Sequence, residues 1–295
     1  MSDSQAPLPF TGERFTPECV REIWYEHWHR YVFARGFVRG KRVLDAACGE
    51  GYGSALLAGE ASSVLGMDLD EAAIAHARAR YGERANLRFM SGDCTALDLP
   101  AASLDVVVSF ETLEHVHAQQ ALIAGFARVL TDDGVLLVSS PDKRTYSDIS
   151  GFRNEFHVRE LYRDELLALL APQFPHVALY GQKLLFQSAI WAMDSTLQTL
   201  SAATSTAQQP QDGLGYDPLY FIAICSKRPL QQALPGVALF GDREESVYQH
   251  YNGEVRKNMA AGARLAQLEA ELAALRGSCA PRAAAAWWRR LLGRK

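Results

Sequence analysis

Paired cysteines, long apolar runs and an excess of basic residues are all lacking in this sequence of 295 residues. The five cysteines are an odd number and none stands in a Cys-x-x-Cys pair, which argues against a disulfide framework and against a thiolate zinc site. No apolar run reaches the ~18 residues that a membrane-spanning helix needs. The 30 bases and 34 acids leave a formal charge of −4, which argues against a general nucleic-acid binder.

A secretory signal is also missing from the sequence, because Met1 to Phe10 contain no apolar stretch. Together with the unpaired cysteines, this predicts a protein of the reducing cytoplasm. Apolar residues make up 48% of the chain and charged residues 22%, which are the proportions of a soluble protein with a packed core. The length suits one large α/β domain with additions, or two modest domains.

Short apolar segments alternate with helical patterns from residue 42 onwards. The pattern predicts strands at 42–46, 63–67, 87–90, 104–109, 134–139, 176–182 and 220–226. It predicts helices at 18–36, 49–59 (after a glycine-rich turn), 71–81, 118–130 and 160–170. Strands that alternate with helices at this spacing indicate a doubly wound, mostly parallel seven-stranded sheet with helices on both faces.

Changes in composition divide the chain into five parts. These are an N-terminal arm with a helix (1–36), the α/β domain (37–228), a proline-broken connector (229–241), a long helix with apolar residues at 3-4 spacing (242–277) and a basic tail (278–295). An insertion interrupts the α/β domain, and we expect a helix at 184–200 followed by a mobile loop at 201–215. The aromatic N-terminal helix either covers the site or packs on the sheet.

A glycine-rich turn, Asp45-Ala-Ala-Cys-Gly-Glu-Gly-Tyr-Gly53, follows the first predicted strand. Glycines let a ligand approach the backbone closely, and ligands bind at the carboxyl ends of parallel strands. Asp68 ends the second strand, where its carboxylate can accept hydrogen bonds from both hydroxyls of a ribose or can cap the next helix. Asp93 ends the third strand, where a carboxylate suits the exocyclic amine of an adenine. Its alternative is a plain turn residue after Gly92.

These three elements resemble the class I S-adenosylmethionine-dependent methyltransferases, with a Rossmann-like fold, from about Lys41 to Lys227. The segment 105–116 resembles the fourth motif of that family, and 134–141 resembles its fifth strand. The resemblance implies S-adenosylmethionine as the cofactor, bound by Asp45, Ala47, Gly49, Gly51, Asp68, Leu69, Asp93, Cys94 and Phe110. One position departs from the family pattern Asp-x-Gly-x-Gly-x-Gly, because Ala47 stands at its first glycine.

A dinucleotide-binding oxidoreductase is the main alternative. Its phosphate turn has the spacing Gly-x-Gly-x-x-Gly and aims backbone N–H groups at a pyrophosphate. Here the spacing is Gly-x-Gly-x-Gly and Glu50 stands inside the turn. A carboxylate beside a pyrophosphate would be repulsive, whereas a sulfonium and an α-amino group would tolerate it. The turn therefore favours S-adenosylmethionine.

Methyl transfer to a hydroxyl needs a base that takes the hydroxyl proton. His157 is the first candidate, with Glu160 either orienting it or supporting the next helix. His115 is the second candidate and Glu111 the third. The alternatives are that His157 braces that helix and that His115 packs near the cofactor. The sequence shows no metal-ligand cluster, so we expect no metal.

A second resemblance concerns the acceptor. The segments 11–15, 25–31 and 156–160 and the long C-terminal helix resemble methyltransferases of bacterial surface-polysaccharide clusters, which modify sugars of lipopolysaccharide O-chains. This implies O-methylation of a sugar hydroxyl of a surface glycan or its precursor. The nearest alternative is a small molecule, such as a quinone precursor or a secondary metabolite. An alternative of another class is a non-catalytic coiled-coil scaffold that keeps the fold.

The C-terminal region suggests partners other than nucleic acid. Six bases with tryptophans and leucines between them fill residues 276–295, a composition that can lie on an anionic membrane surface. The alternative is a plain basic end. The heptads of 242–277 predict a homo-oligomer, or else a single amphipathic helix folded back on the domain. We therefore expect a cytoplasmic protein with peripheral contact to the inner face of the membrane as an option.

Overall fold

A computed structural model describes residues 22–188, 190, 203–205 and 210–292 of the chain. The chain divides into two units, one ending at Phe240 and one beginning at Gly241. Within the described residues, no helix is both long and apolar enough to cross a bilayer.

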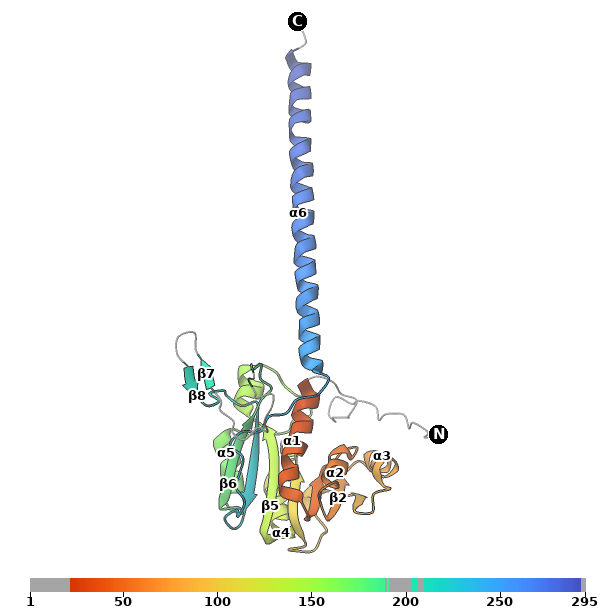
Figure 1. Ribbon diagram of the computed structural model, residues 1–295, viewed down its shortest axis with the longest axis vertical. Coiled ribbons are helices and arrows are strands. Elements are labelled where there is room, and N and C mark those ends of the chain that lie inside the picture. The colour runs from red at the N-terminus through yellow and green to blue at the C-terminus, as the bar shows by residue number, and fades with distance from the viewer. Residues whose placement is uncertain (1–21, 189, 191–202, 206–209, 293–295) are drawn as a thin grey trace. The chain divides into compact units, whose positions relative to one another are not determined.

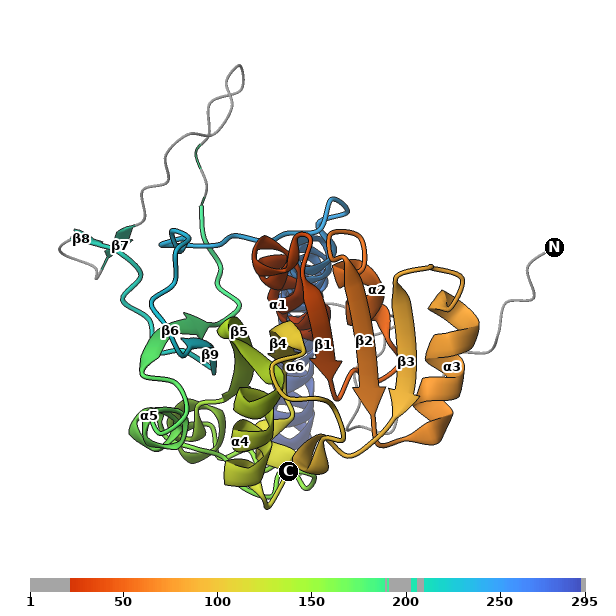
Figure 2. The same cartoon turned by 90° about the horizontal axis from the view of Figure 1, so that it is seen from below.

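A seven-stranded sheet forms the centre of the first unit, in the order β3-β2-β1-β4-β5-β9-β6 (Figure 2). Its strands are β1 (Arg42–Ala46), β2 (Ser63–Asp68), β3 (Leu87–Ser91), β4 (Leu104–Ser109), β5 (Leu130–Pro141), β6 (His176–Gln182) and β9 (Tyr220–Ser226). The first five are parallel, and β9 runs antiparallel to both of its neighbours. The predicted doubly wound, mostly parallel sheet is therefore confirmed.

Helices cover both faces of this sheet. One face packs against α1 (Glu22–Val38), α2 (Tyr52–Leu57) and α3 (Glu71–Tyr81), and the other against α4 (Gln119–Val129) and α5 (Arg163–Leu170). Successive strand residues point to opposite cores: Val106 and Val108 face the first, and Val107 faces the second. Because both faces are covered, the central strands carry apolar residues on both of their faces.

Two glycines of the turn after β1 are required by close packing. A Cβ on Gly53 would lie 2.1 Å from the ring of Tyr31, so only glycine lets α1 approach α2 here. A Cβ on Gly51 would lie 2.7 Å from the ring of Phe89, and Gly51 also has a φ of +89°. The glycines of this turn therefore serve helix packing as well as any ligand.

The insertion differs from its prediction. The expected helix at 184–200 is absent over 184–188, and the rest of that range, apart from the equally non-helical residue 190, lies outside the described residues. Leu184 and Leu185 line a pocket instead, and a short apolar run does not distinguish these two uses. The expected loop at 201–215 contains a two-stranded hairpin of β7 (Ala203–Ser205) and β8 (Pro210–Asp212), separate from the main sheet (Figure 1).

The segment 229–241, which the sequence analysis separates from the α/β domain as a connector, also differs from its prediction. Residues 229–240 belong to the first unit. Leu230 and Leu234 pack against the core of the α1 face, and the ring of Phe240 stacks on His29 of α1 at 5.5 Å. These apolar contacts explain why the proline-broken segment stays with the domain.

The second unit is dominated by one helix, α6 (Ser246–Leu292). It begins four residues later than the predicted helix and continues beyond the predicted end at residue 277. The side chains from residue 277 onwards lie outside the described part, as does the N-terminal segment 11–15. The interpretation of the basic tail as a membrane contact therefore stays a prediction.

Candidate active site

The turn after β1 and the end of β2 are held together by one carboxylate. Asp68 Oδ2 accepts a hydrogen bond from the Gly49 N–H at 2.8 Å, and its Oδ1 accepts from the Asp70 N–H at 3.0 Å. The neighbouring Asp70 caps α3 by accepting from Ala72 N–H at 2.7 Å. The cap that sequence reasoning left open for Asp68 therefore belongs to Asp70, and Asp68 faces the carboxyl edge of the sheet.

Ala47 shows why its position is a glycine in the family motif. Its φ is +58°, in the left-handed region that only glycine occupies without strain. The chain keeps the turn with alanine at a cost of about 1–2 kcal/mol. The departure from the motif therefore leaves the conformation of the turn intact.

Glu50 points away from the ligand edge. Its carboxylate is buried and lies 3.2 Å from His76 Nε2, from Arg80 Nη1 and from the Tyr81 hydroxyl, all on α3. The prediction that this carboxylate would stand beside the ligand is therefore wrong. The reason is that three donors on α3 compensate the cost of burying the charge.

Asp45 is fully buried beneath the turn. Its Oδ1 accepts from the Tyr31 hydroxyl at 3.0 Å, and its Oδ2 accepts from the Ser54 hydroxyl at 2.5 Å. Burial raises the pKa of Asp45 to about 7, although both hydrogen bonds act against this rise. Asp45 thus braces α1 and α2 against β1, and its side chain is not exposed to a ligand.

The other predicted cofactor residues lie along the same edge. Asp93 is exposed, and its Oδ1 accepts from the N–H and the hydroxyl of Thr95 at 2.8 and 2.7 Å. Leu69 is 73% exposed, which offers an apolar surface next to Asp68. Cys94 is buried, which raises the pKa of its thiol to about 12, and Phe110 packs edge-on against Tyr31.

Two loops bring the predicted catalytic residues together. The carbonyl of Glu114 accepts from the N–H groups of Val158 and Arg159 at 2.8 and 3.0 Å, which fixes the loop after β4 against the loop before α5. The rings of His115 and His157 then lie 5.0 Å apart, edge to face. The predicted pairing of His157 with Glu160 is present, with Nδ1 and Oε1 2.6 Å apart.

The hydrogen bonds indicate the tautomers of both histidines. His157 Nδ1 donates to Glu160, and its Nε2 accepts from the Asn154 amide at 3.0 Å. His115 Nδ1 lies 3.0 Å from the Phe156 carbonyl, which can only accept. Each ring therefore carries its basic lone pair on Nε2. Helix α5 has its own cap at Tyr162, so His157 does not brace the helix start.

Glu111 adopts a strained backbone conformation at this site, with a φ of +52°. Its Oε1 accepts from the Ser139 hydroxyl at 2.6 Å, and its Oε2 lies 3.6 Å from Arg30 Nη2. Glu114, three residues further on, is 1% exposed, and burial raises its pKa well above the ordinary value. Glu111 is thus already engaged in an ion pair, which favours the histidines as bases.

Sequence reasoning missed a buried charge cluster on α1. Arg30 is 1% exposed, its Nε donates to Gln182 Oε1 at 2.8 Å, and its guanidinium lies 4.4 Å from the ring centroid of Tyr220. The Tyr220 hydroxyl donates to Glu26 at 3.2 Å, and burial raises the pKa of Glu26 to about 7. The i, i+4 spacing of Glu26 and Arg30 on an otherwise aromatic face was the available signal.

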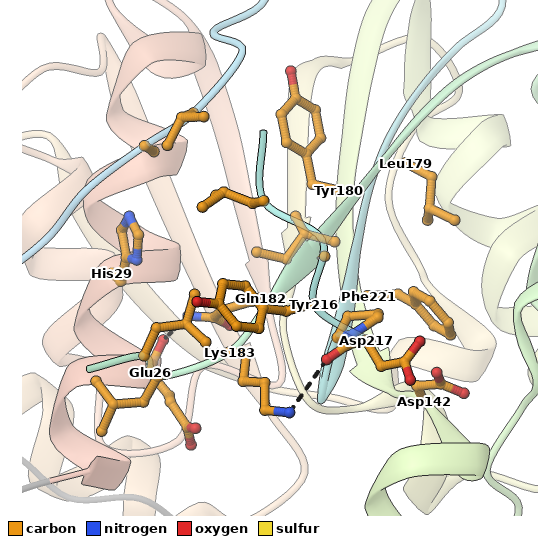
Figure 3. Close-up of a pocket in the computed structure, with 18 of the residues that line it drawn as sticks. Glu26, His29, Asp142, Leu179, Tyr180, Gln182, Lys183, Tyr216, Asp217 and Phe221 are labelled. Carbon is orange, nitrogen blue, oxygen red and sulfur yellow. Dashed lines mark hydrogen bonds between the residues drawn. The ribbon is translucent and has the colours of Figure 1, made fainter. Parts of the chain in front are cut away.

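A pocket of about 920 Å³ opens next to this cluster (Figure 3). Glu26 and His29 of α1 lie on one side of it, and Asp142 and Asp217 on the other. None of the predicted cofactor residues lines this pocket. The ring of Tyr146 connects the two regions, because it stacks on His157 at 5.3 Å and lies 5.8 Å from the ring of Tyr220.

Comparison with known proteins bears on the fold and the family. Residues 44–138 match a family model described as a methyltransferase domain. A solved protein from Bacillus subtilis, YcgJ, matches 69% of this chain and 100% of its own at a TM-score of 0.50 and 19% identity. A chain of the Trm112 methyltransferase activator complex from Haloferax volcanii matches 70% of this chain and 92% of its own at a TM-score of 0.52 and 17% identity. The chain has the class I methyltransferase fold.

Relatives with higher identity are methyltransferases by name. A probable S-adenosylmethionine-dependent methyltransferase of Mycolicibacterium smegmatis is 45% identical over 166 residues, which are 55% of this chain and 63% of that protein. A protein of the same description from Mycobacterium tuberculosis is 41% identical over 182 residues, 60% of this chain and 65% of its own. A ubiquinone biosynthesis O-methyltransferase of Thiobacillus denitrificans is 32% identical over 121 residues, 40% of this chain and 52% of its own. The chain thus spans less than two thirds of the length of each.

The burial of Asp45 predicts how the stability of the methyltransferase domain depends on pH. Because the folded pKa of about 7 lies above the ordinary aspartate pKa of 3.8, this group contributes stability below pH 4 that is lost as the pH rises towards 7. The loss is on the order of 4 kcal/mol. We expect Asp45→Asn to flatten the decline in unfolding free energy between pH 4 and pH 7, measured by urea denaturation.

Asp105→Asn is the control with the opposite sign. The Arg42 guanidinium lowers the pKa of Asp105, so that contribution is present at neutral pH and is lost on acidification. An unchanged slope in Asp45→Asn would show that Asp45 is ionised in the folded protein and would contradict the prediction.

Proposed function

We propose that this protein is an S-adenosylmethionine-dependent methyltransferase that methylates a hydroxyl of a bacterial surface glycan or its precursor. One observation carries the proposal. Asp68 is hydrogen-bonded to the glycine turn at the carboxyl end of the parallel strands, and the His157–Glu160 pair lies in a loop that follows the same sheet. The relatives named as S-adenosylmethionine-dependent methyltransferases support the reaction class.

The residues at the edge of β1, β2 and β3 fit this cofactor. We assign Asp68 to the ribose hydroxyls, since a carboxylate that accepts two backbone N–H groups still has lone pairs for further donors. Asp93 suits the exocyclic amine of the adenine, and the exposed side chain of Leu69 offers its ring an apolar contact. Gly49, with a φ of +56°, keeps the backbone open to the methionine part.

When bound, S-adenosylmethionine supplies a methyl group on a positively charged sulfur. We assign to His157 the task of taking the proton of the acceptor hydroxyl on Nε2 as the oxygen attacks the methyl group. Glu160, at 2.6 Å from Nδ1, stabilises the imidazolium that forms. The Asn154 amide must yield its place at Nε2 to the acceptor. Since His115 also carries its lone pair on Nε2, it is the second candidate base.

The pocket beside Glu26 supports a polar acceptor. Its wall combines carboxylates and an amide with the aromatic rings of Tyr25 and Tyr216. Carboxylates and amides accept hydrogen bonds from hydroxyl groups, and the rings can pack against the apolar face of a sugar. A ligand there would approach His157 past Tyr146 and Tyr220. A small aromatic acceptor is the second candidate, favoured by the likeness to ubiquinone biosynthesis O-methyltransferases.

A non-catalytic scaffold is less consistent with the structure. The feature in its favour was the alanine at the first glycine of the motif, and Ala47 adopts the left-handed conformation that the turn requires. A histidine held by a carboxylate is, in addition, an arrangement that a pure scaffold does not need.

The cofactor assignment predicts the effect of Asp68→Asn on calorimetric binding of S-adenosylmethionine and S-adenosylhomocysteine. The amide oxygen preserves an acceptor for the turn but loses the charge, so we expect binding about 10- to 100-fold weaker. Asp132→Ala removes an exposed aspartate that pairs with Arg228, and it should bind like the wild type. If the wild type bound neither compound, the methyltransferase proposal would be wrong.

The base assignment predicts a separate defect in turnover. We expect His157→Ala to retain cofactor binding but to lower methyl transfer from labelled S-adenosylmethionine by about 10²- to 10⁴-fold. The acceptors compared would be sugar nucleotides, lipid-linked sugars and catechols. His117→Ala, an exposed histidine two positions from His115, is the matched control. Equal turnover in both variants would remove His157 from the mechanism, and turnover with catechols alone would favour the small-molecule acceptor.

We further propose that α6 pairs with a second copy of itself as a parallel coiled coil. Leu265, Leu268, Leu272 and Leu275 are 44–64% exposed and follow the a and d positions of two heptads. In a parallel pair, Arg264 of one copy would face Glu269 of the other, and Glu271 would face Arg276. Both flanking pairs are therefore attractive, which supports a second copy as the occupant of this leucine stripe.

Charge reversal tests this pairing by analytical ultracentrifugation of the full chain. We expect Arg264→Glu to weaken self-association about five-fold, since it replaces attractive pairs by repulsive ones at roughly 0.5 kcal/mol each. Adding Glu269→Arg should restore it. If the double variant stayed weak, the helices would not be parallel and in register, and a monomeric wild type would exclude the coiled coil.

A further inference from the structure

The strongest unexplained feature of the domain is the carboxylate of Glu114. It is 1% exposed, and neither of its oxygens accepts a hydrogen bond from another described residue. A buried carboxylate normally pairs with donors or with a cation, because burial without either costs several kcal/mol. The backbone of Glu114 is fixed by two hydrogen bonds to its carbonyl, so the side chain is held in place.

Two histidine nitrogens lie next to this carboxylate. Glu114, His115 and His157 each place a ligand atom within 4.8 Å of the others, and His115 Nε2 lies 3.9 Å from Glu114 Oε1. Tetrahedral coordination with bonds near 2.0–2.1 Å would need about 3.3 Å between ligand atoms. The distance of 3.9 Å between His115 Nε2 and Glu114 Oε1 exceeds that value, so metal binding requires these side chains to move closer together.

The surroundings of both rings match those of metal-bound histidines. A histidine that binds a metal usually donates its other ring N–H to a carboxylate or a backbone carbonyl, which orients the ring. Here His157 Nδ1 donates to Glu160 at 2.6 Å, and His115 Nδ1 donates to the Phe156 carbonyl at 3.0 Å. Both Nε2 lone pairs are therefore of the kind that a metal accepts. The Asn154 amide at His157 Nε2 would be displaced.

We propose that Glu114, His115 and His157 bind a divalent transition-metal ion of the zinc class. Two imidazoles and one carboxylate are a ligand set that zinc and non-haem iron share, whereas magnesium prefers oxygen ligands alone. No spacing pattern in the sequence indicates this site, because His157 lies 42 residues from His115. The site rests on the proposed methyltransferase function and changes one part of it. Because an Nε2 atom that binds a metal cannot also take a proton, the ion would hold the acceptor oxygen and lower the pKa of its hydroxyl in place of a base at His157.

The test uses untagged full-length protein freed of metal by chelation, titrated with Co²⁺ and Zn²⁺. We expect one Co²⁺ per chain with visible absorption bands of low coordination number, displaced by Zn²⁺, and a rise in melting temperature with Zn²⁺. Glu114→Gln keeps the size of the side chain and removes its charge, so the fold should persist while metal binding is lost. Glu160→Gln should weaken binding about 10- to 100-fold through the orientation of His157.

His117→Ala is the matched control, because it removes an exposed histidine next to the cluster and should bind metal like the wild type. Absence of Co²⁺ binding by the wild type, or equal binding by wild type and Glu114→Gln, would overturn the proposal. Calorimetric titration of the same samples with S-adenosylmethionine distinguishes failure of the metal site from failure of the proposed methyltransferase function. Cofactor binding without metal would refute only this site, and metal without cofactor would refute only the proposed function.

Discussion

The burial of one guanidinium organises the side of this domain on which we propose that the acceptor binds. Arg30 is a permanently charged side chain placed in the interior, and such a charge is tolerated only where partners surround it. It receives them from three separate elements: Gln182 at the end of β6, Tyr220 at the start of β9 and Glu111 after β4. Because these partners come from distant parts of the chain, α1 is held at the site instead of merely covering the sheet.

The next residue of α1 attaches the helix to the turn after β1 with a different chemistry. Tyr31 follows Arg30 directly and reaches the buried Asp45, while Gly53 leaves room for its ring. One helix thus contacts the turn on the cofactor side through a neutral network and the pocket on the acceptor side through charges. A change in α1 should therefore affect both sides of the site, which is the arrangement needed to align an acceptor with a methyl donor.

The sequence predicted most of the sheet, and it predicted that the glycine turn and Asp68 lie at the carboxyl ends of neighbouring strands, because strand periodicity is a local signal. The orientation of the Glu50 side chain could not be predicted in this way, since it depends on donors that α3 supplies across the turn. The contact between His115 and His157 could not be predicted either, because it depends on two backbone hydrogen bonds to the carbonyl of Glu114. The helix expected at 184–200 is absent over its described part, 184–188 and 190, because apolar residues that line a pocket resemble those of an amphipathic helix.

Two strained residues mark where the cofactor and acceptor sides meet. Ala47 follows β1 and Glu111 follows β4, and these two strands are neighbours in the sheet. Both residues have a φ above +50°, a conformation that costs about 1–2 kcal/mol for a residue with a Cβ. Strain of this kind persists only where other contacts determine it, and Ser139 and Arg30 provide them for Glu111. The ion pair with Arg30 and the hydrogen bond from Ser139 therefore hold the Glu111 carboxylate in place despite the strain of its backbone.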